Sequence, residues 1–181
     1  MVPLGTQAPD FNLLDVISHQ MIKFSNFSQH RKAIVVMFIC NHCPYVKHIN
    51  EGLVHLATDY QNKPVGFLAI NANDVESYPE DSPENMALQA KSSGYSFPYL
   101  YDETQEVAQL FNAACTPDFF VFNEQQTLVY RGQFDDSRPG NNLPVTGKDL
   151  RHAIDCILTR MPNQEPQKPS IGCNIKWKAE I

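Results

Sequence analysis

The feature that most constrains this chain is an apolar segment that runs directly into two cysteines and a proline. Ala33–Ile39 is apolar throughout and rich in β-branched residues, which predicts a central strand buried on both faces. Cys40–Cys43 follows with the sequence Cys-Asn-His-Cys, and Pro44 comes next. Proline is tolerated only in the first turn of a helix, because it lacks an N–H and clashes with a preceding turn. A helix should therefore begin very near the cysteine pair.

The rest of the chain alternates between helical and strand patterns. Apolar residues at steps of three and four predict a helix after Pro44. Its inner face comprises Val46, Ile49, Leu53, Leu56 and Tyr60. The strands expected are a peripheral hairpin within residues 8–30, a strand at Val65–Ile70, a short strand at Phe97–Tyr101 and an antiparallel pair formed by Phe119–Phe122 and Thr127–Tyr130. Three further helices are expected. The first opens at Ser82-Pro83-Glu84, the second is started by Asp102 and Gln105 with Val107, Leu110 and Phe111 inside, and the last is capped by Thr146. This order predicts an α/β fold with a mixed sheet.

Regular structure is expected to stop near residue 161. Pro162, Pro166 and Pro169 interrupt any helix or central strand there. The final segment, Ile171–Lys178, contains the only tryptophan and is expected to dock back. The predicted organisation is therefore a domain over residues 1–160, followed by a proline-rich linker and docked tail over residues 161–181.

Charge and hydropathy exclude several classes of function. The chain has 181 residues, with 14 basic against 20 acidic side chains and a net charge of −6. This balance argues against nucleic acid or an anionic membrane as partner, because both require a cationic surface. The longest apolar run, Ala33–Cys40, is too short to span a bilayer. The N-terminal residues do not form a secretory signal, so a cytoplasmic location is expected. No phosphate-binding glycine motif is present, and we expect no organic cofactor.

The position of the cysteine pair favours redox chemistry. Unpaired N–H groups and the positive dipole end of a helix stabilise a thiolate, which is the nucleophilic form of cysteine. Cys40, the outer residue, is expected to attack, and Cys43, about one turn further in, to resolve the mixed disulfide. A protonated His42, with Asn41 beside it, is expected to tune the pKa of Cys40.

Two alternatives to redox chemistry remain open from the residues alone. The first is a metal-binding or metallochaperone module that uses Cys40, Cys43 and a histidine. Zinc needs further ligands, and the candidates are His42, His48, Cys115 and Cys173, but a second CxxC or an HxxxH is missing. The second alternative is a purely structural pair. We prefer redox chemistry and expect no bound metal, because CxxC stands between a strand and a helix.

Several segments resemble the thioredoxin-fold superfamily, in the branch shared by peroxiredoxin-like (redoxin) proteins and thiol–disulfide oxidoreductases. The segments are Gln7–Leu13, Cys40–Pro44, Ala113–Phe119 with its Thr-Pro step, and Arg131-Gly132-Gln133. The resemblance covers about residues 5–160. Asp135–Arg138 and the tail around Cys173 resemble an uncharacterised bacterial subgroup of thioredoxin family proteins. Ile39 stands where the family usually has tryptophan, and Ala33–Ile39 lacks the buried acid of thioredoxin.

This resemblance implies a thioredoxin-like fold and a thiol–disulfide oxidoreductase active in cell redox homeostasis. Cys40 would be the nucleophile and Cys43 the resolver. Thr116 and Pro117 would form the loop that pairs with a substrate chain as an added strand, with a cis bond before Pro117. The implied partners are protein or small-molecule disulfides and thiols, with a thioredoxin- or glutathione-type reductant. The alternative within this class is a thiol-dependent, antioxidant peroxidase of peroxiredoxin-like type; Cys40 stands where that type has threonine.

Three further cysteines lie outside the CxxC. Cys115, next to the Thr-Pro step, and Cys173, in the tail, are candidate auxiliary thiols. The tail is long enough for Cys173 to reach the pair and exchange electrons with it. Cys156 is expected to be a core residue of the last helix. We assign no role to Asn71 and Asp74, although both follow the second predicted strand.

Overall fold

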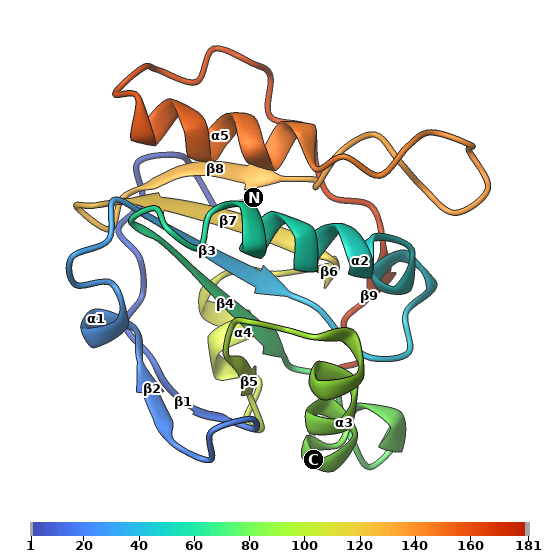
Figure 1. Ribbon diagram of the computed structural model, residues 1–181. Helices are drawn as coiled ribbons and strands as arrows, with labels where there is room; N and C mark the ends of the chain where they lie inside the picture. Colours follow the sequence, from blue (N-terminus) through green and yellow to red (C-terminus); the bar gives the residue numbers. More distant parts are fainter. Residues whose placement is uncertain (1, 180–181) are drawn as a thin grey trace.

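The strand that precedes the cysteine pair lies near the middle of a mixed sheet. In the computed structural model, which describes residues 2–179, the seven strands of this sheet are ordered β2-β1-β5-β4-β3-β7-β8 (Figure 1). Met1 and residues 180–181, the end of the predicted tail, lie outside the described residues. The strands are β1 (Asn12–Asp15), β2 (Met21–Lys23), β3 (Ala33–Phe38), β4 (Val65–Asn71), β5 (Tyr99–Tyr101), β6 (Cys115–Thr116), β7 (Asp118–Asn123), β8 (Leu128–Gly132) and β9 (Cys173–Asn174).

Strand direction makes the sheet mixed. Strand β3 is parallel to β4, and β4 is parallel to β5, whereas β7 is antiparallel to both β3 and β8. The predicted N-terminal hairpin is present as β1 and β2. Together with the helices on both faces, this arrangement confirms the predicted thioredoxin-like α/β fold. A second, two-stranded sheet joins β6 to β9.

The helices divide between the two faces of the sheet. They are α1 (Phe24–Phe27), α2 (Pro44–Asp59), α3 (Pro83–Ser93), α4 (Glu106–Leu110), α5 (Lys148–Leu158) and the short 3₁₀ helix η1 (Pro79–Asp81). Buried residues of α2, α3 and α5 share one apolar cluster, and those of α1 and α4 share another (Figure 1). In β3, Val35 and Met37 enter the first cluster, and Val36 and Phe38 enter the second. The strand is therefore buried on both faces, as predicted.

The start of one helix differs from the sequence prediction, and the start of another agrees with it. Gly147, not Thr146, is the N-cap of α5, with a φ of 67° and Phe134 packed where a Cβ would lie. The Thr146 hydroxyl still accepts a hydrogen bond from the N–H of Lys148. Gln105 caps α4, and the carboxylate of Asp102 accepts from backbone N–H groups inside that helix.

Some residues predicted to pack inside lie at the surface instead. Leu110 of α4 is 59% exposed because the helix is short and only part of it faces the sheet. In the tail, Trp177 is 43% exposed, whereas Ile175 is the residue that enters the core. The predicted strand Phe97–Tyr101 is shorter than expected, as it begins at Tyr99.

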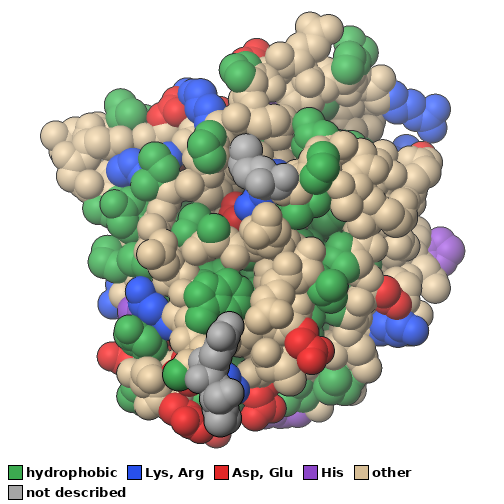
Figure 2. Space-filling model, turned by 180° about the vertical axis from the view of Figure 1, so that it is seen from behind, with side chains coloured by type: hydrophobic (Ala, Val, Ile, Leu, Met, Phe, Trp, Pro, Cys, Tyr) green, Lys and Arg blue, Asp and Glu red, His purple; other side chains and the backbone are tan. Residues whose placement is uncertain are grey.

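The distribution of charged side chains on the surface agrees with the expectation that the protein lacks a cationic face for nucleic acid or anionic membranes. On the face shown in Figure 2, lysine and arginine side chains are scattered and several lie close to acidic ones, so they do not form one basic surface there. Within the described residues, every helix is either too short or too polar to cross a lipid bilayer.

Candidate active site

The cysteine pair lies where β3 ends and α2 begins, as the sequence predicts. Cys43 is the N-cap residue of α2 and Pro44 occupies the first turn. Both sulfur-bearing residues are buried, since Cys40 is 2% exposed and Cys43 is 0% exposed. All five cysteines are free thiols. Cys40, expected as the outer residue, is therefore covered by neighbouring segments almost as fully as Cys43.

Hydrogen bonds favour the thiolate at Cys43 rather than at Cys40. Interactions with the Cys40 and Cys173 thiols and with the N–H groups of Val46 and Cys173 lower the pKa of Cys43, against the opposing effect of its burial. The hydrogen bond that Cys40 donates to Cys43, together with burial, raises the pKa of Cys40. The sequence prediction placed the thiolate on Cys40. The directions of the two pKa shifts point to Cys43 instead, since Cys173 and the N–H of Val46 approach that sulfur while Asp81 lies near Cys40.

The Thr-Pro loop lies against the pair. The Thr116–Pro117 peptide bond is cis, as predicted. The Thr116 hydroxyl lies 3.3 Å from the Cys40 sulfur, and its carbonyl oxygen lies 3.4 Å from the Cys43 sulfur. Thr116 thus contacts both cysteines, one through its side chain and one through its backbone.

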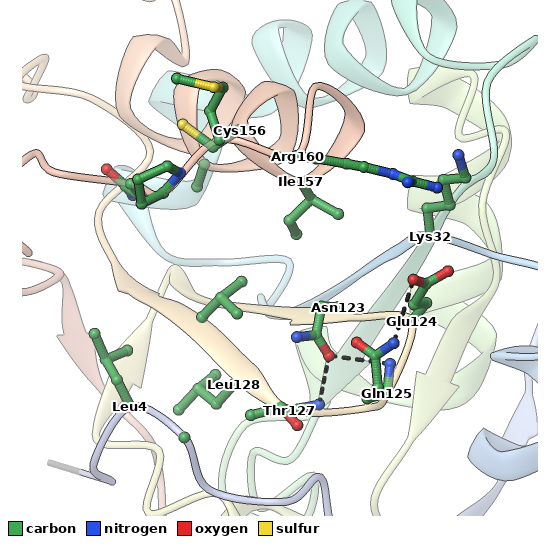
Figure 3. A pocket seen from close by; sticks show the side chains of 16 residues that line it. Leu4, Lys32, Asn123, Glu124, Gln125, Thr127, Leu128, Cys156, Ile157 and Arg160 are labelled. Carbon is green, nitrogen blue, oxygen red and sulfur yellow. Dashed lines mark hydrogen bonds between the residues drawn. The ribbon is translucent and has the colours of Figure 1, made fainter.

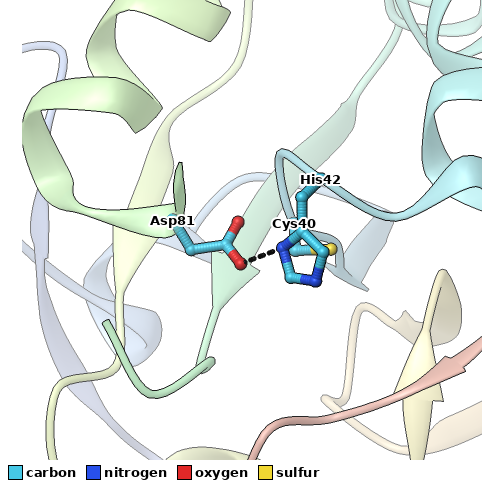
Figure 4. Close-up of side chains that lie close together, drawn as sticks. All are labelled: Cys40, His42 and Asp81. Atoms are coloured by element: carbon cyan, nitrogen blue, oxygen red, sulfur yellow. Dashed lines mark hydrogen bonds and ion pairs between the residues drawn. The ribbon is translucent and has the colours of Figure 1, made fainter. Parts of the chain in front are cut away.

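A buried carboxylate that sequence reasoning missed stands beside Cys40. Asp81, in η1, is 0% exposed. Its oxygens accept a hydrogen bond from His42 Nδ1 at 2.5 Å (Figure 4). They also accept one from the Asn41 N–H at 2.7 Å. The amides of Asn71 and Asn73 donate to it at 3.1 and 2.9 Å. Its negative charge contributes to raising the pKa of Cys40.

The two residues between the cysteines are held by this carboxylate. His42 also stacks on Tyr78, with ring centroids 5.3 Å apart. Asn41 donates through its amide to the Glu80 carbonyl and accepts from the Tyr99 hydroxyl. Asn41 therefore anchors the loop, and His42 is part of an acid–histidine pair next to Cys40. The sequence held one signal for this site, the polar residue Asn71 at the end of β4, to which the sequence analysis assigned no role.

Three of these groups also form the one cluster within residues 2–179 that could hold a metal ion. The Cys40 sulfur, a ring nitrogen of His42 and a carboxylate oxygen of Asp81 all lie within 4.8 Å of one another. Cys43, which the metal alternative requires, does not belong to this cluster. Three such groups would leave the fourth position of a tetrahedral zinc to another ligand.

The C-terminal tail brings a third sulfur to the pair. Strand β9 is antiparallel to β6, with Cys173 opposite Thr116 and Asn174 opposite Cys115. The Cys173 sulfur lies 2.8 Å from the Cys43 sulfur. Burial and the hydrogen bond between the Cys173 and Cys43 thiols raise the pKa of Cys173 to about 11.

The other two cysteines lie elsewhere. Cys115 is adjacent to Thr116 in β6 and so points to the opposite face of the strand. Burial raises its pKa to about 12, which favours the inert thiol. Cys156 lines a cavity of about 580 Å³ between α5 and the turn from β7 to β8 (Figure 3). Asn123 in that cavity pairs with Ala33, at the end of β3 away from the CxxC.

Two solved structures are similar to this chain over nearly its whole length. It is 57% identical to an uncharacterised conserved protein from Geobacillus kaustophilus, covering 100% of this chain and 95% of that one with a TM-score of 0.97. A hypothetical protein from Sinorhizobium meliloti is 46% identical over 99% of this chain and 97% of that one, with a TM-score of 0.96.

A more distant structure shares the fold. A secreted disulfide oxidoreductase of Mycobacterium tuberculosis, homologous to DsbE of Escherichia coli, is 15% identical with a TM-score of 0.61, covering 81% of this chain and 95% of that one. No protein of curated function matches the sequence. The AhpC/TSA family model matches residues 4–131, which confirms the resemblance to the redoxin branch of the thioredoxin fold. The chain belongs to the AhpC/TSA family.

Proposed function

We propose that this protein is a thiol–disulfide oxidoreductase that cycles Cys40 and Cys43 between dithiol and disulfide. The observation that carries the proposal is the contact of Thr116, next to cis-Pro117, with both sulfurs of a CxxC at the start of α2. Thiol exchange requires a cysteine whose thiolate is stabilised, and the start of a helix provides such a place. The lowered pKa of Cys43 supports the same chemistry.

Each cysteine has a role consistent with its surroundings. Cys40 forms the mixed disulfide with a substrate, and the Cys43 thiolate attacks Cys40 to release the reduced product. Because its pKa is raised, Cys40 must lose its proton to a base before it attacks. A ring nitrogen of His42 lies within 4.8 Å of the Cys40 sulfur, and His42 Nδ1 is bound to Asp81. We assign the proton of Cys40 to this histidine.

Two cysteine variants test the proposal. Cys40→Ser is expected to reduce insulin disulfides much more slowly than wild type, and Cys43→Ser is expected to accumulate mixed disulfides that gel electrophoresis resolves. Cys156→Ser is the control, because Cys156 lines the cavity at the far end of the sheet. Undiminished insulin reduction by Cys40→Ser would contradict the assignment.

A thiol-dependent peroxidase is the second candidate, favoured by one observation. A peroxidase needs a thiolate that attacks peroxide, and the thiolate environment here is at Cys43. Stopped-flow mixing with hydrogen peroxide separates the two functions. A peroxidase keeps its first turnover in Cys40→Ser and loses it in Cys43→Ser, whereas consumption no faster than that of a free thiol excludes this candidate.

A further inference from the structure

The tail strand occupies the edge where a substrate chain is expected to pair. The resemblance assigns this edge to Thr116, and in the structure Thr116 pairs with Cys173. Figure 1 shows the tail returning to the end of the sheet at which α2 begins. The chain therefore places its own extended segment, and its own cysteine, at the site that the proposed function gives to a substrate.

Close contacts hold the tail on both sides of Cys173. A Cβ on Gly172 would lie 2.0 Å from the carbonyl oxygen of Thr116, so only glycine allows this approach. Before it, the Ser170 hydroxyl bonds to Asp118 and to the carbonyl of Gly132. After it, Ile175 is 3% exposed in the core. Cys173 is thus fixed at both ends.

The three sulfurs differ in access to solvent. Cys40 and Cys43 are buried, whereas Cys173 is partly exposed. The distance of 2.8 Å between the sulfurs of Cys43 and Cys173 needs less than about 1 Å of movement to reach a disulfide bond. The sulfur nearest to solvent is therefore also within bonding reach of the low-pKa cysteine.

We propose that Cys173 is a third redox cysteine that exchanges disulfide with the CxxC through Cys43. This inference rests on the proposed function, which supplies the Cys40–Cys43 disulfide. The Cys173 thiolate attacks Cys43 Sγ, so that the Cys43–Cys173 bond forms and the Cys40–Cys43 bond breaks. The electron pair leaves on Cys40, which takes up a proton to replace the one that Cys173 lost. The step is an isomerisation and needs no further oxidant.

Formation of the Cys43–Cys173 disulfide places a sulfur of the disulfide, Cys173 Sγ, where an external thiol can reach it. An incoming thiolate attacks Cys173 Sγ, forms a mixed disulfide there, and displaces Cys43 as a thiolate. A thiol of low pKa is the better leaving group, and the position of Cys43 at the start of α2 favours its thiolate. Electrons therefore pass between solvent and the buried pair by way of the tail.

Disulfide mapping of the full chain tests this relay. Protein equilibrated in glutathione redox buffers is quenched in acid, alkylated under denaturing conditions, digested and analysed by mass spectrometry. Wild type is expected to show a Cys43–Cys173 link beside Cys40–Cys43. The decisive sample is Cys40→Ser, in which Cys43–Cys173 is expected to be the main disulfide. Cys115→Ser and Cys156→Ser are the controls and should keep the wild-type pattern.

The outcomes separate this inference from the proposed function. If wild type forms Cys40–Cys43 but oxidised Cys40→Ser carries glutathione on Cys43 and leaves Cys173 free, the relay is overturned and the oxidoreductase stands. If wild type forms no disulfide between Cys40 and Cys43 in any buffer, the proposed function fails. Circular dichroism checks that Cys40→Ser is folded, and Cys40→Ala repeats the measurement if the serine variant is not.

Discussion

Replacement of Gly172 by alanine is expected to loosen the tail from the Thr-Pro loop and to separate Cys173 from Cys43. The new Cβ would lie 2.0 Å from the carbonyl oxygen of Thr116 and 2.7 Å from its carbonyl carbon. Favourable contacts between heavy atoms begin near ~3.5 Å, so the tail must move by more than about 1 Å. Both neighbouring atoms belong to the backbone of a buried strand, which leaves the tail as the part that moves.

The size of the effect follows from the cost of overpacking. An added methyl group in a well-packed site costs about 1–3 kcal/mol. Since about 1.4 kcal/mol corresponds to a factor of ten, the effective concentration of Cys173 at Cys43 should fall by about 5- to 150-fold. The measurement uses Cys40→Ser as background and titrates the Cys43–Cys173 link with glutathione.

Asn174→Ala is the matched control, because Asn174 belongs to the same strand and its side chain is exposed. It should leave the effective concentration unchanged. Iodoacetamide should also reach Cys43 faster in Gly172→Ala than in the control. Equal effective concentrations and equal alkylation rates in the two variants would show that the packing of Gly172 on Thr116 does not position Cys173.

Three further results are expected. First, Cys43 should keep its thiolate absorbance at 240 nm from neutral pH down to about pH 4, because its pKa is lowered. Cys43→Ser should lose this signal. A titration midpoint near ~8.5, the ordinary pKa of a free thiol, would contradict the assignment. Second, Asp81→Asn should lower the pKa of Cys40, because the nearby negative charge is removed. It should also cost about 2 kcal/mol in urea unfolding, because the new NH₂ group cannot accept the hydrogen bonds made to one of the two carboxylate oxygens. Unchanged values in both measurements would refute this. Third, purified protein should carry less than stoichiometric zinc, whereas stoichiometric zinc that is lost in both Cys40→Ser and His42→Ala would favour the metal alternative.

The elements around the CxxC could be predicted because their signals are local. The apolar run of β3 and the spacing of Val46, Ile49 and Leu53 in α2 each depend on a few adjacent residues. Pro44 fixed the start of the helix for the same reason. The cis bond before Pro117 followed from the family resemblance, since its sequence context alone would also suit an ordinary turn.

The parts that could not be predicted depend on contacts between distant segments. Asp81 reaches Cys40 only because η1 folds over the end of β4, and a three-residue 3₁₀ turn has no periodic signal. Strand β9 is two residues long, too short for any alternation to reveal it. Gly172 is required in the tail because any side chain there would collide with Thr116, and the sequence alone does not show that Thr116 lies beside it.

The reversed order of the two cysteine pKa values has the same origin as the tail's docking. A helix N-terminus alone favours a thiolate at either cysteine, so the choice of Cys40 from the sequence depended on its outer position and on His42. Cys173, through its thiol and its N–H group, contributes to lowering the pKa of Cys43, whereas the negative charge of Asp81 contributes to raising the pKa of Cys40. The tail therefore does more than cover the pair: by docking on Thr116 it helps to decide which sulfur carries the charge, and the same contact brings that sulfur within reach of a third.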